Sequence, residues 1–79
     1  MVLRTSARNR LPGTVTAIKW GDVMAQVDIR AGDNHIVSVI TREAAEELEL
    51  KEGDEVVAVV KSTEVMVAKA GDGDIRYAH

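Results

Sequence analysis

Two short polar stretches, far apart in the sequence, carry residue types that bind anions. In "TSARNRLPG", Ser6, the backbone N–H of Ala7 and the five-donor guanidinium of Arg8 stand side by side. Lys61 and Ser62 combine a cation and a hydroxyl with the backbone N–H groups of a turn. A tetrahedral dianion needs such convergent donors, because its oxygens must regain the bonds lost with their hydration shell. The pattern is compatible with a small oxyanion site, but from spacing alone exposed arginines and a Lys-Ser turn are more often ordinary solvated surface.

The other polar residues give weaker signals. His35 follows a turn and has no second His, Asp or Cys at metal-ligand spacing, so we expect a structural or surface role. Trp20 has no aromatic platform around it for stacking a base or a sugar. The glutamates between residues 43 and 49 fit a solvated helix face. No Ser or Thr stands in a nucleophile, base and carboxylate pattern, so we expect no enzyme and no metal ligated directly by side chains.

Length and composition indicate a small module that completes its core by self-association. The chain has 79 residues, 46% of them hydrophobic, and no cysteine. A lone domain of this size buries only about 60% of its unfolded surface, so we expect a homo-oligomer. The net charge of −3 disfavours a sequence-independent nucleic-acid binder, which needs clustered Lys and Arg. No apolar stretch approaches the ~18 residues that span a bilayer, and we expect a cytoplasmic protein without a membrane partner.

The first half of the chain is predicted to form three strands. The clearest is "VMAQVDIR" at residues 23–30, because it alternates with a period of two. Its apolar residues are predicted to point one way, and Met24, Gln26, Asp28 and Arg30 the other. The preceding "LPGTVTAIKW" favours a strand with Pro12 and Gly13 at its entrance, and "HIVSVIT" follows a turn as the third strand.

A short helix is predicted between residues 41 and 50. Thr41 is placed to cap its N-terminus, and Ala44, Ala45 and Leu48 recur at helical spacing. The "EGD" that follows is typical of a turn.

The remaining elements complete a mainly β fold. "EVVAVVK" reads as a strand that is apolar on both faces, as in a barrel or a subunit interface. Ser62 and Thr63 are predicted to form a tight hairpin loop into a last strand, "EVMVAK". The order fits a five-stranded OB-like barrel with one short helix. We expect one domain at residues 1–70 and a loosely ordered tail at residues 71–79.

Taken together, these stretches resemble the molbindins, the stand-alone form of the TOBE domain that binds molybdate and tungstate. Four landmarks occur in order: the "SARN" opening, the "GDVMAQV" strand, "SVIT" before a helix ending in "LKEGDEV", and "VVKSTEVMVA". The similarity runs from about residue 5 to residue 69. It implies an OB-like barrel with a strand exchanged between two subunits, assembled further into a homohexamer as a trimer of dimers.

The resemblance also implies the residues that hold the oxyanion at subunit interfaces. Ser6, the backbone N–H of Ala7, and Arg8 match the family's positions on one subunit. Lys61 and Ser62 match those that face them from another.

A possible second oxyanion site is implied at the backbone N–H groups of Gly21, Asp22 and Val23. The Asp22 carboxylate departs from the family pattern and would oppose a dianion if it pointed inward. Asn9 is expected to be structural, tying its segment into the barrel.

The implied function is intracellular storage or buffering of molybdate or tungstate, without a catalytic cofactor. Selectivity over sulfate is expected from cavity size. The sequence leaves open which oxyanion is preferred and whether the oligomer is a hexamer or smaller.

Two alternatives belong to other functional classes. Residues 41–69 also look like an AbrB-like swapped-hairpin DNA-binding module, but that interpretation leaves the first two strands and "SARN" unexplained. A protein-interaction barrel would assemble without binding an oxyanion.

Overall fold

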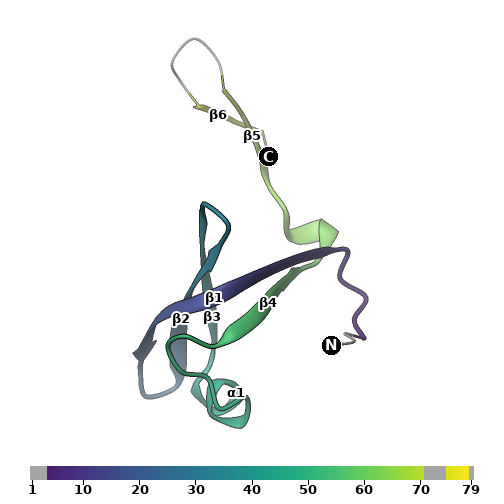
Figure 1. Cartoon of the computed structure of the whole chain (residues 1–79). Helices are drawn as coiled ribbons and strands as arrows, with labels where there is room; N and C mark the ends of the chain where they lie inside the picture. Colours follow the sequence, from purple (N-terminus) through teal and green to yellow (C-terminus); the bar gives the residue numbers. More distant parts are fainter. Residues whose placement is uncertain (1–3, 71–74, 79) are drawn as a thin grey trace. The chain divides into compact units, whose positions relative to one another are not determined.

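The computed structural model describes residues 4–70 and 75–78 of the chain. The chain divides into two compact units, Arg10–Ala58 and the combination of Met1–Asn9 with Val59–His79. The described elements are mostly strands with one short helix, as the sequence predicts, and one 3-10 turn, which it does not (Figure 1). No helix in the described ranges is long and apolar enough to cross a membrane.

A four-stranded sheet forms the body of the fold (Figure 1). The strands β1 (Asn9–Trp20), β2 (Met24–Ala31) and β3 (Asn34–Thr41) are successive antiparallel neighbours. β4 (Glu55–Val60) lies on the other side of β1, which gives the order β3-β2-β1-β4. The three strands predicted in the first half are confirmed, and β1 starts two residues earlier than expected.

The core is built on one face of β2. Val27 and Ile29 are buried there together with Val15 of β1. Their shared face follows from the period of two along a strand, and Ala25 is buried as the same pattern predicts. Val23 lies before the strand and is 71% exposed, so the pattern fails at that end. Partly buried residues complete the cluster: Ile18, Ile36, Ile40, Leu50, Val56 and Ala58.

Gly13 allows β1 to approach β2 very closely. A Cβ at this position would lie 2.5 Å from the carbonyl oxygen of Arg30 and 2.8 Å from Cγ2 of Ile29. A side chain at position 13 would have to displace the backbone of β2, so packing against β2 requires glycine here. The register of the two strands also shifts between Val15 and Ala17, which marks a bulge.

The helix α1 (Arg42–Glu47) begins as predicted. The Thr41 side chain accepts a hydrogen bond from the Ala44 N–H at 3.1 Å, and Ala45 is fully buried. Leu48 is 66% exposed instead of packing on the apolar face, because the helix ends at Glu47 and Leu48 forms its C-cap.

Backbone hydrogen bonds hold the turn after α1 to β1. Gly53 has a φ of 92°, a left-handed conformation that glycine adopts without strain. Its N–H donates to the Val15 carbonyl at 2.8 Å, and the Val15 N–H donates to the Asp54 carbonyl at 2.9 Å. These two bonds set β4 beside β1.

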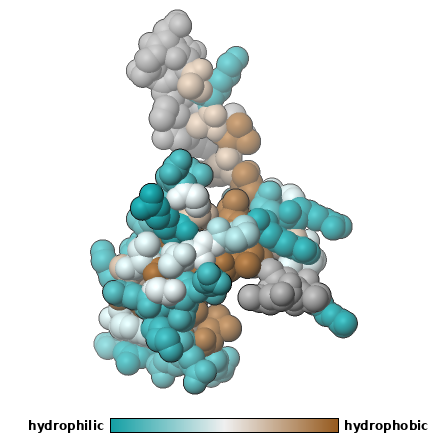
Figure 2. Space-filling view, viewed as in Figure 1, coloured by the Kyte–Doolittle hydropathy of each residue, from teal (hydrophilic) through white to brown (hydrophobic). Residues whose placement is uncertain are grey.

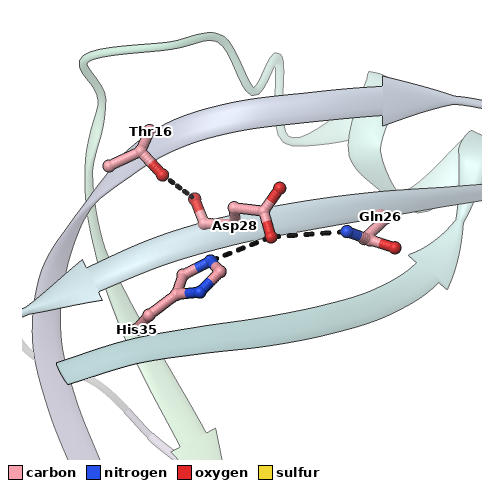
Figure 3. A network of polar contacts seen from close by, with 4 residues as sticks. All are labelled: Thr16, Gln26, Asp28 and His35. Carbon is pink, nitrogen blue, oxygen red and sulfur yellow. Dashed lines mark hydrogen bonds and ion pairs between the residues drawn. The ribbon is translucent and has the colours of Figure 1, made fainter.

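Asp28 is buried, although the alternation of β2 predicts that it points outward. Its Oδ1 accepts hydrogen bonds from His35 Nε2 at 3.0 Å and from Gln26 Nε2 at 3.3 Å (Figure 3). Its backbone carbonyl accepts one from the Thr16 hydroxyl at 3.3 Å. Side chains from three strands therefore surround this residue, and the hydrogen bonds offset the cost of burying a carboxylate. His35 has the structural role expected of it.

The hairpin predicted after β4 is wrong. Lys61 leads into a 3-10 turn, η1 (Ser62–Glu64), and the next strand, β5 (Val67–Ala70), pairs with β6 (Ile75–Ala78). The predicted fifth strand therefore does not join the four-stranded sheet of its own chain. Of the predicted tail at residues 71–79, residues 71–74 and 79 lie outside the described ranges, and the rest is β6.

Candidate anion-binding site

Ser6, Ala7 and Arg8 lie in the segment just before β1. Ser6 and Arg8 are exposed, whereas Ala7 is only 4% exposed and anchors the segment. The Ala7 N–H donates to Thr5 Oγ1 at 3.1 Å, a local bond that Thr often makes to nearby backbone. To serve as the predicted oxyanion donor, this N–H would have to exchange the Thr5 hydroxyl for an anion oxygen. The sequence reasoning missed Thr5, although its spacing of two residues from Ala7 is a recognisable signal.

Lys61 and Ser62 stand at the start of η1. The Lys61 carbonyl accepts from the Glu64 N–H at 2.9 Å, and the Ser62 carbonyl accepts from the Val65 N–H at 3.4 Å. Both side chains are exposed, and Lys61 makes no capping hydrogen bond. The first N–H groups of a helical turn have no partner within it. An ammonium, a hydroxyl and backbone donors therefore gather at one point of the chain.

One hydrogen bond brings the two segments together. Asn9 Nδ2 donates to the Val60 carbonyl at 3.1 Å, across 51 positions of sequence. Asn9 follows Arg8, and Val60 precedes Lys61. The bond therefore places the two predicted donor segments beside each other within a single chain, and it confirms the structural role predicted for Asn9.

Arg8 and Lys61 are both available to an anion. Among residues 4–70, neither side chain makes an ion pair or a hydrogen bond, whereas Arg42, for example, is paired with Glu46. Two cations that have no counter-charge among the described residues, on segments joined by a hydrogen bond, attract an anion, most strongly one of charge −2. Charge-assisted hydrogen bonds from a guanidinium and an ammonium are the strong kind, so this arrangement can hold a small oxyanion.

The loop at Gly21, Asp22 and Val23 offers fewer donors than predicted. The Gly21 N–H donates to the Met24 carbonyl at 2.8 Å inside the turn, which leaves the N–H groups of the next two residues. The Gly21 carbonyl accepts from Arg42 Nη1 at 3.2 Å, and the Val23 carbonyl accepts from the Arg42 backbone N–H at 2.7 Å. The start of α1 therefore holds this loop in place.

The surroundings of that loop are acidic. Arg42 is already engaged, because its Nε donates to Glu46 Oε1 at 2.8 Å and its Cζ lies 5.7 Å from the centre of the Trp20 ring. Three carboxylates, those of Asp22, Glu43 and Glu46, line the depression at this loop, so a dianion is disfavoured here. No group of three or more His, Cys, Asp or Glu residues in the described part of the chain could hold a metal ion. The residues that line the open depression at the loop are Asp22, Val23, Thr41, Arg42, Glu43 and Glu46.

Comparison with known proteins identifies the family. The sequence model of the TOBE domain matches residues 5–67. The chain is 52% identical over 63 residues to molybdenum-pterin-binding protein 2 of Clostridium pasteurianum, covering 78% of this chain and 93% of the relative. A molybdate-binding protein from Sporomusa ovata has a TM-score of 0.81 at 39% identity, over 85% of this chain and 100% of that one. The cytoplasmic molybdate-binding protein ModG, solved with molybdate bound, has a TM-score of 0.73 at 49% identity, over 76% of this chain and 43% of its own.

These matches agree with the fold and the residues described above. They confirm the predicted mainly β, OB-like fold. The TOBE match includes the first two strands and the donor segment before them, which the AbrB-like alternative leaves unexplained. Sequence and fold together show that the chain belongs to the TOBE domain family, among the molybdenum-pterin-binding (Mop) proteins.

Proposed function

We propose that this protein binds molybdate or tungstate without catalysing a reaction. The observation that carries the proposal is that Arg8 and Lys61, which have no ion-pair partner within residues 4–70, stand in segments joined by a hydrogen bond. The relatives named for molybdate or molybdenum-pterin binding support it. The proposed oxyanion ligands are Ser6, Ala7 through its N–H, Arg8, Lys61 and Ser62.

The donor set suits a tetrahedral dianion. Two cations balance its charge, and two hydroxyls with backbone N–H groups replace hydrogen bonds lost with the hydration shell. Hydrogen bonds to charged groups are each worth ~1.5–3 kcal/mol net. Sulfate has the same charge and shape but is smaller, so the spacing of the donors must provide selectivity against it.

We propose that each site is completed between two copies. In a two-fold interface the same surface patch meets itself, so each contact occurs twice. If the patch formed by the two donor segments lies at such an interface, Ser6 and Arg8 of one copy face Lys61 and Ser62 of the other, and the same contact forms a second time with the copies exchanged. A hexamer built as a trimer of such dimers is the assembly that we expect.

The C-terminal part of the chain supports self-association. Val65, Met66 and Val67 are 49%, 77% and 66% exposed, and hydrophobic side chains run along the segment leading to β5 (Figure 2). A contiguous apolar surface of this kind is typical of an interaction site. We propose that β5 is exchanged with a second copy, whose sheet it completes as the fifth strand.

The proposed biological role is cytoplasmic storage or buffering of the oxyanion. The relative ModG is itself described as cytoplasmic. Several relatives are named for molybdenum-pterin, which raises the question whether the ligand carries a pterin. Pterin rings are recognised by stacking on aromatic or apolar surfaces, and none of the five proposed ligand residues is aromatic or large and apolar, so we favour the free oxyanion.

The second site at Gly21, Asp22 and Val23 remains a prediction. Only two of its three backbone N–H groups are left by the turn, and nearby carboxylates oppose a dianion. A second binding event in the titration, beyond the one assigned to the first site and unchanged when Arg8→Ala weakens that site, would support it.

Calorimetric titration of oxyanion-free protein with molybdate, tungstate and sulfate tests the proposal, after light scattering has fixed the oligomeric state. We expect saturable binding of the two metal oxyanions with no pterin present, and no binding of sulfate. Lys51→Ala, which removes an exposed lysine outside the proposed site, is the matched control for Lys61→Ala. If a folded assembly bound none of the three anions, the family resemblance would extend to the fold but not to oxyanion binding.

A further inference from the structure

β6 is an element that the family match leaves out. The TOBE match ends at residue 67, and the Sporomusa ovata relative is covered over its whole length by 85% of this chain. β6 lies beyond that match, and it pairs antiparallel with β5. The register sets Val67 opposite Ala78 and Ala70 opposite Ile75, so each residue of β5 has a partner in β6.

This pairing uses only one edge of β5. A strand presents backbone N–H and C=O groups toward two edges, and within the described residues β5 has no neighbour other than β6. Its other edge is therefore open. We define residues 65–70 with 75–78 as the arm. Met66 and Val67 stay 77% and 66% exposed although β6 is in place, so β6 does not cover these two side chains.

We propose that β6 is a brace that holds β5 extended for docking on a second copy of this chain. The inference rests on the self-association proposed above. The occupant of the open edge is the four-stranded sheet of the second copy, which ends in β3 and β4. β3 is the better acceptor, because Val37 and Val39 on it are 52% and 60% exposed and can pack against the apolar residues of the arm.

The physical reason is preorganisation. Ordering a lone extended segment costs backbone entropy at every residue. Pairing with β6 meets part of that cost before the second copy arrives, and strand addition then supplies main-chain hydrogen bonds at the open edge. A tail that masked β5 would do the opposite, but masking would bury Val65, Met66 and Val67, which remain exposed.

Truncation after Ala70 tests the inference. Sedimentation velocity over a dilution series, with and without saturating molybdate, compares the truncated and full-length chains. We expect the truncated chain to dissociate at a concentration about tenfold higher or more, which corresponds to ~1.4 kcal/mol, while assembled protein binds molybdate as before. Equal or tighter assembly after truncation overturns the brace and leaves the oxyanion function standing. A full-length chain that binds molybdate but stays monomeric overturns the brace and the proposed interface together.

A cysteine pair tests the same inference without removing residues. The chain has no cysteine, and Ala68 lies opposite Tyr77. Opposite residues of antiparallel strands have Cα atoms about 4.5–5.5 Å apart, within reach of a disulfide. Ala68→Cys with Tyr77→Cys should oxidise within the chain and assemble at least as tightly as the parent. The control is Ala68→Cys with Arg76→Cys. Successive residues of a strand point to opposite faces of a sheet, so a cysteine at position 76 should not link to one at position 68. A locked arm that no longer assembles overturns the inference.

Discussion

Replacing Asn9 by alanine should weaken both the fold and the proposed site. The substitution removes the hydrogen bond from Nδ2 to the Val60 carbonyl, which is 3.1 Å long and partly buried. A bond of this kind is worth ~1 kcal/mol net, which lowers the Tm of a domain of this size by about 4–8 °C. If the bond also holds in place the two donor segments that each copy presents to the interface, a similar energy is lost from oxyanion binding. The dissociation constant for molybdate should then rise about fivefold.

Scanning calorimetry gives the Tm, and titration with molybdate well below the Tm of every variant gives the affinity. Thr16→Val is the matched control, because it removes one side-chain hydrogen bond to backbone, 3.3 Å long, within the sheet. We expect this control to lower the Tm by a comparable amount and to bind molybdate like the parent. Parental affinity in Asn9→Ala would show that the bond stabilises the fold without positioning the site, and it would refute the reasoning.

Three further predictions concern the site, the sheet and the helix. Arg8→Ala and Lys61→Ala should each weaken molybdate binding by ~1.5–3 kcal/mol in titrations, with assembly intact by light scattering; unchanged affinity in both would contradict the site. Gly13→Ala should lower the free energy of unfolding by ~1–3 kcal/mol, since its Cβ would lie 2.5 Å from the Arg30 carbonyl oxygen; an unchanged urea midpoint would argue against that packing. Thr41→Ala should cost ~0.5–2 kcal/mol in the same assay, and Thr41→Ser should recover most of it if the hydroxyl is the cap.

The sheet and the helix start could be predicted because their signals are local. The alternation at residues 23–30 places Ala25, Val27 and Ile29 on the core face, as observed. Thr41 predicts the start of the helix because its hydroxyl accepts a hydrogen bond from the Ala44 N–H, three positions further on. This capping bond is local and does not depend on the rest of the fold.

The burial of Asp28 and the exposure of Leu48 could not be predicted from local patterns. The alternation of β2 cannot reveal that His35 and Gln26 converge on the Asp28 carboxylate and bury it, because β3 supplies one of these partners from another strand. Leu48 fits helical spacing, but the helix ends before it and leaves it exposed. Burial in both cases depends on the position of neighbouring elements, which the spacing of residue types does not contain.

The candidate site could be predicted only in part, because its residues are set by local patterns and their proximity by a long-range contact. Residue types alone locate its two donor segments, and the Asn9–Val60 bond that joins them spans most of the chain. The Lys61-Ser62 turn signal fits a hairpin and a 3-10 turn equally well, so it could not tell whether β5 returns to its own sheet. A four-residue strand whose residues are all exposed has little to bury within its own chain. Its own residues therefore do not decide its pairing: among the described residues it pairs with β6, the next strand along the chain, and the sheet edge of a second copy is the other partner that we propose.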